Sequence, residues 1–372
     1  LVCEFDSEGN AYLPAFFQSR IYIDFSSPEA ANQNWEQLVR LLHGKPQYEK
    51  PELGSPPLYV SQPSALPTSP AVSKLAVLRN ALLNGRPGLA MYRSHFLKAA
   101  ISHANTLRVR TAPTQQNADE LGKQIVDDFA KLKVIRNHFV DWILLEAAAA
   151  PSSEFEDSVL SVLEQLLELK ARPEEVTQWN EAWFGAHQLF VYETFLYVVA
   201  ALLKYSAFHT LHEIYTSHYL SPKSGRHHEA PFETFESFYG YSDVIGPALS
   251  AEHRYYSASA ELVRRHADRS DLPFESIMEA DLLTFLIALL SQKRWYPGTL
   301  LYSRYARDFP LFIRAIQHKG FKNLATITGV DNAEVLRERI KSALAGLSSN
   351  FRFQFDRDFW EAMRASHFDT LK

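Results

Sequence analysis

Apolar residues recur every three to four positions through most of the chain beyond residue 70, the spacing that places them on one face of an α-helix. Two such stripes run over residues 119–150, where Pro151 marks the end, and over residues 154–171. The same spacing predicts one or two helices over 174–220, single helices over 248–266 and 274–292, and a helical tail from 309 to 368. Nothing in this region alternates with period two for long. We therefore predict a mainly α-helical domain over residues 71–372, with little or no sheet.

The first sixty residues follow a different pattern. Residues 20–25, with the sequence RIYIDF, are rich in β-branched and aromatic side chains and are followed by two serines and a proline, so they are predicted to form a strand. Residues 30–42 carry Trp35, Leu38, Val39 and Leu42 at helical spacing, and Gly44 is a suitable end for that helix. A strand followed by such a helix is half of an α/β unit.

A proline-rich stretch separates the two patterns. It begins near residue 46 and holds seven prolines: Pro46, Pro51, Pro56, Pro57, Pro63, Pro67 and Pro70. Prolines at this density exclude helix and central strand and favour an extended spacer. The predicted organisation is an α/β part over residues 1–60, a linker over 61–70, and the helical domain over 71–372.

Composition narrows the range of partners. The chain has 38 Lys and Arg residues against 43 Asp and Glu, for a net charge of −5, whereas proteins that bind nucleic acid over their whole surface carry a basic excess. Two local basic groups keep a nucleic-acid-binding sensor as an alternative: Lys223, Arg226, His227 and His228 in one loop, and Arg264, Arg265, His266 and Arg269 near a helix end. The expectation from charge is that nucleic acid is not the favoured partner.

The cellular setting follows from two further features. Cys3 is the only cysteine, so no disulfide can form within the chain, which fits a reducing cytosol. The longest apolar run, residues 189–203, is interrupted by Glu193 and Thr194 and is shorter than the ~20 residues that a membrane span needs. We therefore expect a cytoplasmic protein without a membrane segment.

Residues 1–60 resemble the closing part of a bacterial Toll/interleukin-1 receptor (TIR) domain. Leu1-Val2-Cys3-Glu4 matches the end of the fourth strand with its following acid, and Leu13-Pro14-Ala15-Phe16-Phe17 follows. The strand over 20–25 and the helix over 35–42 then match the fifth strand and the last helix, and Lys50-Pro51-Glu52-Leu53-Gly54-Ser55-Pro56-Pro57 matches the segment that closes the domain. This resemblance implies the end of a flavodoxin-like α/β fold. In it, residues 1–5 and 21–25 are expected to be adjacent parallel strands.

The resemblance also implies an activity. TIR enzymes of bacterial antiphage defence hydrolyse NAD at the glycosidic bond, so NAD is expected as a substrate and no cofactor is expected. The catalytic Glu of the family lies on a helix before the fourth strand. We expect that segment upstream of Leu1, because the chain opens without a Met on what reads as a strand under way, so no catalytic residue is assigned here. Glu4 and Asp24 would border the substrate site; the simpler reading is that both serve turns and caps.

Other candidate sites in the helical part give weaker patterns. His209, His212, Glu213 and His218 match no metal-binding spacing of the zincin type, so no metal is expected. An RNase pairing of an Arg with a His on one helix face fails for Arg136, because His138 does not share its face. Pro297-Gly298 interrupts a helix next to Trp295 and Tyr296, and two surface aromatics there would suit a protein partner; the simpler reading is buried packing at a corner of the fold.

We therefore expect a TIR-type NAD hydrolase that acts as an effector of bacterial antiphage defence, with the helical domain acting as a sensor or an assembly and regulatory module. TIR enzymes resemble one another in needing assembly, so self-association or a protein trigger is the expected partner. A non-enzymatic TIR scaffold is the alternative, and a nucleic-acid-binding sensor comes after it. A catalytic Glu on the helix before the fourth strand would separate the enzyme from the scaffold.

Overall fold

The fold was obtained as a computed structural model of the 372-residue chain, and it divides into two compact units, Leu1–Pro67 and Thr68–Lys372. The structure describes residues 23, 25, 27–43, 70–111, 117–149, 152–220, 232–250, 252, 255–305, 309–346 and 371, without the side chains of 303–305. The expected parallel strands over 1–5 and 21–25 lie outside the described residues, apart from Ile23 and Phe25. No outcome is assigned to them.

The described part of the first unit contains helix α1, Pro28–Leu42, which confirms the helix predicted at 30–42. It begins where the sequence supplies a cap: the Ser27 hydroxyl accepts a hydrogen bond from the Ala30 N–H at 3.1 Å, and Pro28 stands in the first turn. None of its residues is buried, and Trp35 keeps 60% and Leu42 76% of its surface exposed.

The second unit is predominantly α-helical, as predicted. Its helices in chain order are α3 (Pro70–Leu83), α4 (Leu89–Thr106), α5 (Ala118–Ala147), α6 (Ser153–Lys170), α7 (Gly185–Lys204), α8 (Phe208–Thr216), α9 (Gly246–Leu249), α10 (Ala258–His266), α11 (Phe274–Leu290), α12 (Pro310–Ala315), α13 (His318–Thr328) and α14 (Ala333–Ala345). Short 3-10 helices span Glu181–Phe184, Phe235–Phe238 and Gly298–Tyr305. Among the described residues the sheet is a single antiparallel pair, β1 (Tyr219–Leu220) and β2 (Phe232–Glu233), with Tyr219 opposite Glu233.

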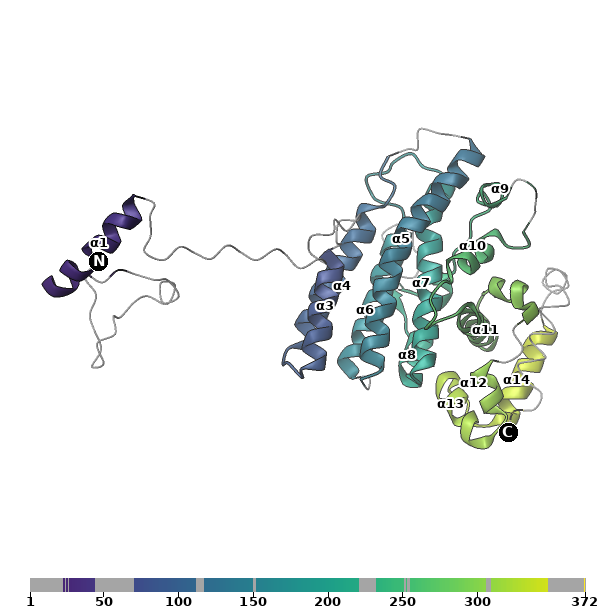
Figure 1. The fold of residues 1–372 in the computed structure, drawn as a ribbon. Coiled ribbons are helices and arrows are strands. Elements are labelled where there is room, and N and C mark those ends of the chain that lie inside the picture. Colours follow the sequence, from purple (N-terminus) through teal and green to yellow (C-terminus); the bar gives the residue numbers. More distant parts are fainter. Residues whose placement is uncertain are drawn as a thin grey trace. The chain divides into compact units, whose positions relative to one another are not determined.

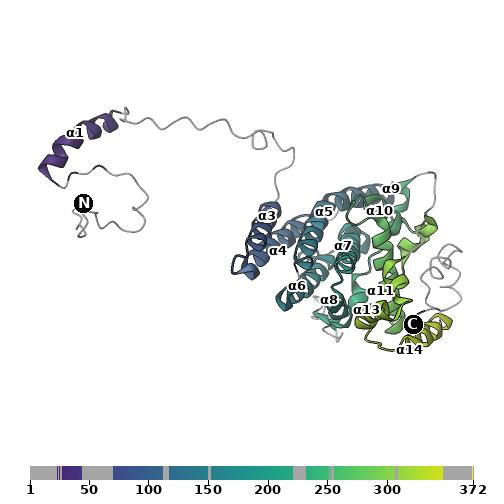
Figure 2. The same ribbon diagram turned by 60° about the horizontal axis from the view of Figure 1, so that its bottom comes forward.

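Helix α7 lies at the centre of this unit. Seventeen of its 20 residues are buried, and α5, α6, α8 and α11 all pack against it. Figure 1 shows α3 to α7 side by side with roughly aligned axes, and Figure 2 shows α7 enclosed between α5 and the later helices. The segment from Glu181 to Lys204 is apolar and long enough to span a membrane, but 89% of its most apolar window is buried inside the unit. The burial is that of a core helix.

Residues 174–220 form two α-helices, α7 and α8, which is one of the two outcomes predicted, whereas the helix predicted at 248–266 is interrupted. The region 174–220 breaks after Lys204, because Ser206 takes a left-handed backbone conformation with φ of 58° and the chain restarts in α8. The prediction for 248–266 was wrong for its first half: α9 ends at Leu249 and α10 begins only at Ala258. Here Ser257 caps α10 through a hydrogen bond from the Ala260 N–H, which fixes the later start.

A buried ion pair joins the two longest core helices. The Arg136 guanidinium on α5 lies 2.7 Å from the Glu193 carboxylate on α7, and both side chains are fully buried. The guanidinium also lies over the Tyr197 ring, 4.0 Å from its centroid, and donates to the Asn137 side chain at 2.7 Å. Nδ1 of His266 is 3.6 Å from Glu193. These contacts hold α5, α7 and α10 in one register.

Removing one partner of this pair should destabilise the fold strongly. We expect Glu193→Met to lower the free energy of unfolding by roughly 3–5 kcal/mol, because it leaves the buried Arg136 charge uncompensated. The double variant Arg136→Met/Glu193→Met should recover most of that loss, since neither charge then remains. Urea denaturation of the four proteins of the cycle measures both effects, and equal losses in the single and double variants would contradict the assignment.

Candidate functional site

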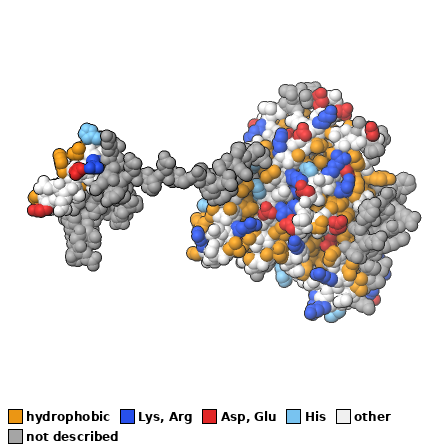
Figure 3. Space-filling model, viewed as in Figure 1, with side chains coloured by type: hydrophobic (Ala, Val, Ile, Leu, Met, Phe, Trp, Pro, Cys, Tyr) orange, Lys and Arg blue, Asp and Glu red, His pale blue; other side chains and the backbone are white. Residues whose placement is uncertain are grey.

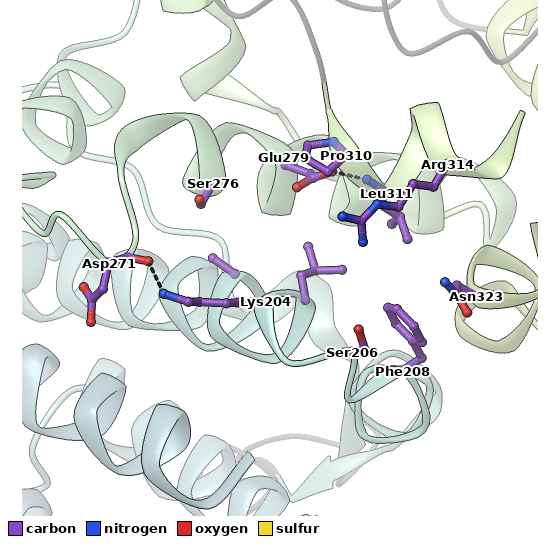
Figure 4. Close-up of a pocket in the computed structure, with 12 residues that line it drawn as sticks. Lys204, Ser206, Phe208, Asp271, Ser276, Glu279, Pro310, Leu311, Arg314 and Asn323 are labelled. Carbon is purple, nitrogen blue, oxygen red and sulfur yellow. Dashed lines mark hydrogen bonds between the residues drawn. The ribbon is translucent and has the colours of Figure 1, made fainter. Parts of the chain in front are cut away.

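A cavity of about 290 Å³ opens where α7 ends, and it is the candidate site of the helical unit. Its walls come from segments far apart in the sequence: α7 and the turn after it, the start of α8, the loop before α11 and its first turns, α12 and α13 (Figure 4). The lining residues are Ala200, Leu203, Lys204, Ser206, Phe208, Asp271, Ser276, Glu279, Pro310, Leu311, Arg314 and Asn323. The cavity thus depends on the tertiary fold and not on any one motif.

Glu279 is the buried acid of this cavity. It points from α11 toward the start of α12, where its carboxylate accepts the Leu311 backbone N–H at 2.7 Å, and only 8% of the residue is exposed. Burial raises the pKa of Glu279 to about 7, although the Leu311 N–H and the nearby Arg314 charge act in the opposite direction. The side chain therefore exists in both protonation states near neutral pH, and it can accept or donate a hydrogen bond.

Four other polar side chains around the cavity have no partner within the part of the chain that the structure describes: Ser206, Ser276, Arg314 and Asn323. Arg314 is exposed, and in Figure 4 its guanidinium turns back from α12 toward the centre of the cavity. Lys204 differs, because its ammonium donates to the Asp271 backbone carbonyl at 2.8 Å. Free polar groups that converge on a cavity are available to a ligand.

The apolar residues of the lining are Ala200, Leu203, Phe208, Pro310 and Leu311. The other seven lining residues, Asp271 among them, are polar or charged. The lining is therefore more polar than that of the usual small-molecule site, which is mostly apolar with a few placed polar groups. Ser206 and Ser276 have no neighbouring base among the described residues that would activate a hydroxyl as a nucleophile. The arrangement therefore supports binding better than covalent catalysis.

Trp295 does not form the exposed aromatic surface expected from the sequence. It is 4% exposed, and its indole N–H donates to the Asp281 carboxylate at 2.7 Å. Its ring packs on Tyr192, Phe195 and Tyr239 at centroid separations of 5.5–5.8 Å. The expected exposure was wrong because the break at Pro297-Gly298 turns the chain into the core; Tyr296 beside it is half-buried.

Asp281 accepts the hydrogen bonds of the polar groups that are buried around Trp295. Besides Trp295, it accepts the Thr299 backbone N–H at 3.0 Å and the Thr299 hydroxyl at 2.6 Å. Burial raises its pKa to about 6, and these hydrogen bonds limit the rise. All of its partners lie within the core, so Asp281 anchors the segment after α11 and does not face a ligand.

The basic cluster near the end of α10 is engaged within the protein. Arg264 and Arg265 both donate to Glu261, at 2.9 and 2.8 Å. Arg269 pairs with Asp141 and Asp271, and His266 is buried and stacked on Phe129. The other basic group, Lys223 to His228, lies outside the described residues. Figure 3 shows positive and negative side chains interspersed over the visible face of the helical unit. These pairings do not favour a nucleic-acid surface at α10.

The other candidate residues named from the sequence do not form a common site among the described residues. His209 and His218 are exposed, and a ring nitrogen of His212 lies 3.1 Å from the Ile327 carbonyl. Arg136 is enclosed with Glu193, so it is not accessible to a nucleic-acid substrate. Glu4 and Asp24 lie outside the described residues.

The functional residues that the sequence did not indicate are Glu279 and Arg314. Glu279 stands in the apolar run SIMEADLLTFLIALL, and an acid within such a run is the signal of a buried carboxylate. Arg314 gives no signal, because nothing in its local sequence shows that the start of α12 lies next to Glu279. Comparison with known proteins finds no matching family model, no matching curated protein and no matching solved structure.

The raised pKa of Glu279 predicts how stability depends on pH. Folding favours the protonated form of Glu279, and this preference stabilises the folded state. The stabilisation is complete below pH 4.5, the ordinary pKa of a Glu side chain. It is lost as pH rises to about 7. Glu279→Gln removes the titration. We therefore expect the variant to gain stability relative to wild type between pH 4.5 and 7, by up to about 3 kcal/mol.

Urea denaturation at several pH values measures this gain. Asp281 and His187, whose pKa values also shift on burial, titrate in both proteins and cancel in the difference. Glu275→Gln is the matched control, because Glu275 is exposed on the same helix. Parallel stability curves for wild type and Glu279→Gln would show that Glu279 titrates as it does in the unfolded chain.

Proposed function

We propose that this chain joins the closing part of a TIR domain to a helical regulatory module. The parent would be a cytoplasmic NAD hydrolase of bacterial antiphage defence. The observation that carries the regulatory role is the cavity at the end of α7. Four polar side chains without a partner among the described residues line it together with a buried acid. A helical unit that served only as a spacer would have no need of such a cavity. Its ligand would be the signal that the module reads.

The enzymatic part of the proposal rests on the resemblance of residues 1–60. Breaking the nicotinamide–ribose bond develops positive charge on the ribose, so a carboxylate must be held beside it in a fixed geometry. In the proposed arrangement that carboxylate is the family's Glu, on the helix before the fourth strand. Glu4 and Asp24 border the site and do not carry the reaction.

The module would control assembly, since TIR enzymes resemble one another in completing their sites by association. A ligand in the cavity contacts α7, α8, α11, α12 and α13 together, so its binding energy would favour one arrangement of these helices over others. Self-association or a protein trigger then follows as the expected partner. The chain binds its signal in one unit and contributes to the enzyme in the other.

A non-enzymatic interaction protein is the second candidate, and one observation favours it. Helix α1 presents large apolar side chains to solvent, with Trp35 60%, Leu41 56% and Leu42 76% exposed. Exposed apolar residues on one helix are typical of protein–protein contacts. In that case residues 1–60 would act as a docking element.

Nicotinamide release separates these two candidates. We expect the 372-residue chain to release none from NAD, because none of its residues matches the family's catalytic Glu. A longer protein in which residues 1–60 complete a TIR domain with that Glu should release it once assembled. Chromatography of the purified reactions and the NAD content of phage-infected cells measure both.

Two results would overturn the proposal. Turnover by the 372-residue chain itself would place the active site within these residues. A longer protein that is assembled and still inactive, in infected cells as well as in purified form, would favour the docking role.

A further inference from the structure

The cavity at the end of α7 has a buried acid on one side and exposed polar and basic side chains on the other. Glu279 lies deep, with 8% of its surface exposed, whereas Arg314, Ser206 and Lys204 are exposed at the rim. A ligand that satisfies both ends presents an N–H group to the buried carboxyl and an anion to the guanidinium. Its charged end stays near water, so it does not bear the full cost of burying a charge.

The middle of the cavity suits a flat ring. Leu203, Leu311 and the Phe208 side chain form apolar parts of the wall. Aromatic heterocycles gain both apolar burial and ring contacts against such a wall. A zwitterionic amino acid with a small or polar side chain would satisfy Glu279 and Arg314 but would leave this apolar section without a partner.

The free oxygen of Glu279 determines which hydrogen-bonding groups the edge of the ligand ring must present. One oxygen already accepts the Leu311 N–H at 2.7 Å, which leaves the other for the ligand. Because burial brings the pKa of Glu279 to about 7, this oxygen can accept from an amino group or donate to a ring nitrogen. An aminopurine presents both groups on one edge. The hydroxyls of Ser206 and Ser276 and the Asn323 amide remain for a sugar.

The volume sets the upper limit of size. At about 290 Å³ the cavity is at the lower end of the range of small-ligand sites, roughly 300–1,000 Å³. One nucleoside with a single phosphate at the open rim fits that space. A dinucleotide such as NAD exceeds it, so this cavity is distinct from a site for the substrate.

We propose that the cavity binds a purine nucleoside monophosphate, with the base against Glu279 and Phe208 and the phosphate on Arg314. This assignment rests on the proposed regulatory role for its biological meaning, but the binding itself does not depend on it. The ligand would link α11 to α12 and α13 and would stabilise the folded unit by mass action.

Calorimetric titration of the full 372-residue chain with AMP tests the assignment. We expect one saturable site. Arg314→Met should weaken AMP binding by about tenfold or more, since it removes a charge-assisted contact to phosphate. Glu279→Gln and Phe208→Leu should also weaken it. Lys322→Met, an exposed cation of α13 outside the cavity, should leave it unchanged. Arg314 is exposed, so its variant should fold, and circular dichroism verifies this.

Three further probes make the outcome decisive. Adenosine should bind wild type and Arg314→Met equally, and NAD and inorganic phosphate should bind more weakly than AMP. No binding of AMP by the folded chain at millimolar concentration overturns the assignment. Equal binding of phosphate and AMP, or AMP binding unaffected by both Arg314→Met and Glu279→Gln, also overturns it. None of these measurements uses NAD hydrolysis, so this proposal and the proposed enzymatic function can fail separately.

Discussion

Helix α7 has to be covered on nearly every side, and the rest of the helical unit is arranged around that requirement. Seventeen of its 20 residues are buried, Glu193 among them, so the surrounding helices must supply both apolar contacts and a cation. Helix α5 supplies the cation through Arg136, at 2.7 Å. On the opposite side α11 carries Asp281, whose hydrogen bonds to Trp295 and Thr299 bring the following segment into the core. Apolar burial provides the driving force, and the two carboxylates specify which element lies where.

The cavity lies at the end of α7, where the surrounding helices no longer bury the chain. Beyond Leu203 the chain becomes exposed, and Ser206 takes a left-handed conformation that costs a residue with a side chain about 1 kcal/mol. The tight turn it makes leaves α8 pointing away from the end of α7. Helices α12 and α13 border the space, and their Arg314 and Asn323 side chains line it. A strained turn beside a partly filled space is typical of a place where structure serves binding.

The sequence predicted the parts of the fold that depend on local periodicity. Helices α5, α6 and α11 appear within a few residues of their predicted bounds, because each is long and its ends carry caps or prolines. The sequence left open whether residues 174–220 form one helix or two, and it did not locate the break at Ser206, since no Gly or Pro marks it. Trp295 was misplaced, because the indole reaches Asp281 only through the tertiary fold. That Glu279 and Arg314 line one cavity could not be predicted at all, since 35 positions separate them and neither stripe nor spacing connects them.

The enclosed pair on α5 and α7 has a consequence for how this protein can diverge. A change at position 136 or 193 alone leaves one charge in a site that water does not reach, so a lineage that makes one change is at a disadvantage until it makes the other. The two positions are therefore inherited as a unit. In a set of homologous sequences they should vary together, as Arg with Glu or as two apolar residues, while the exposed positions on either side vary independently.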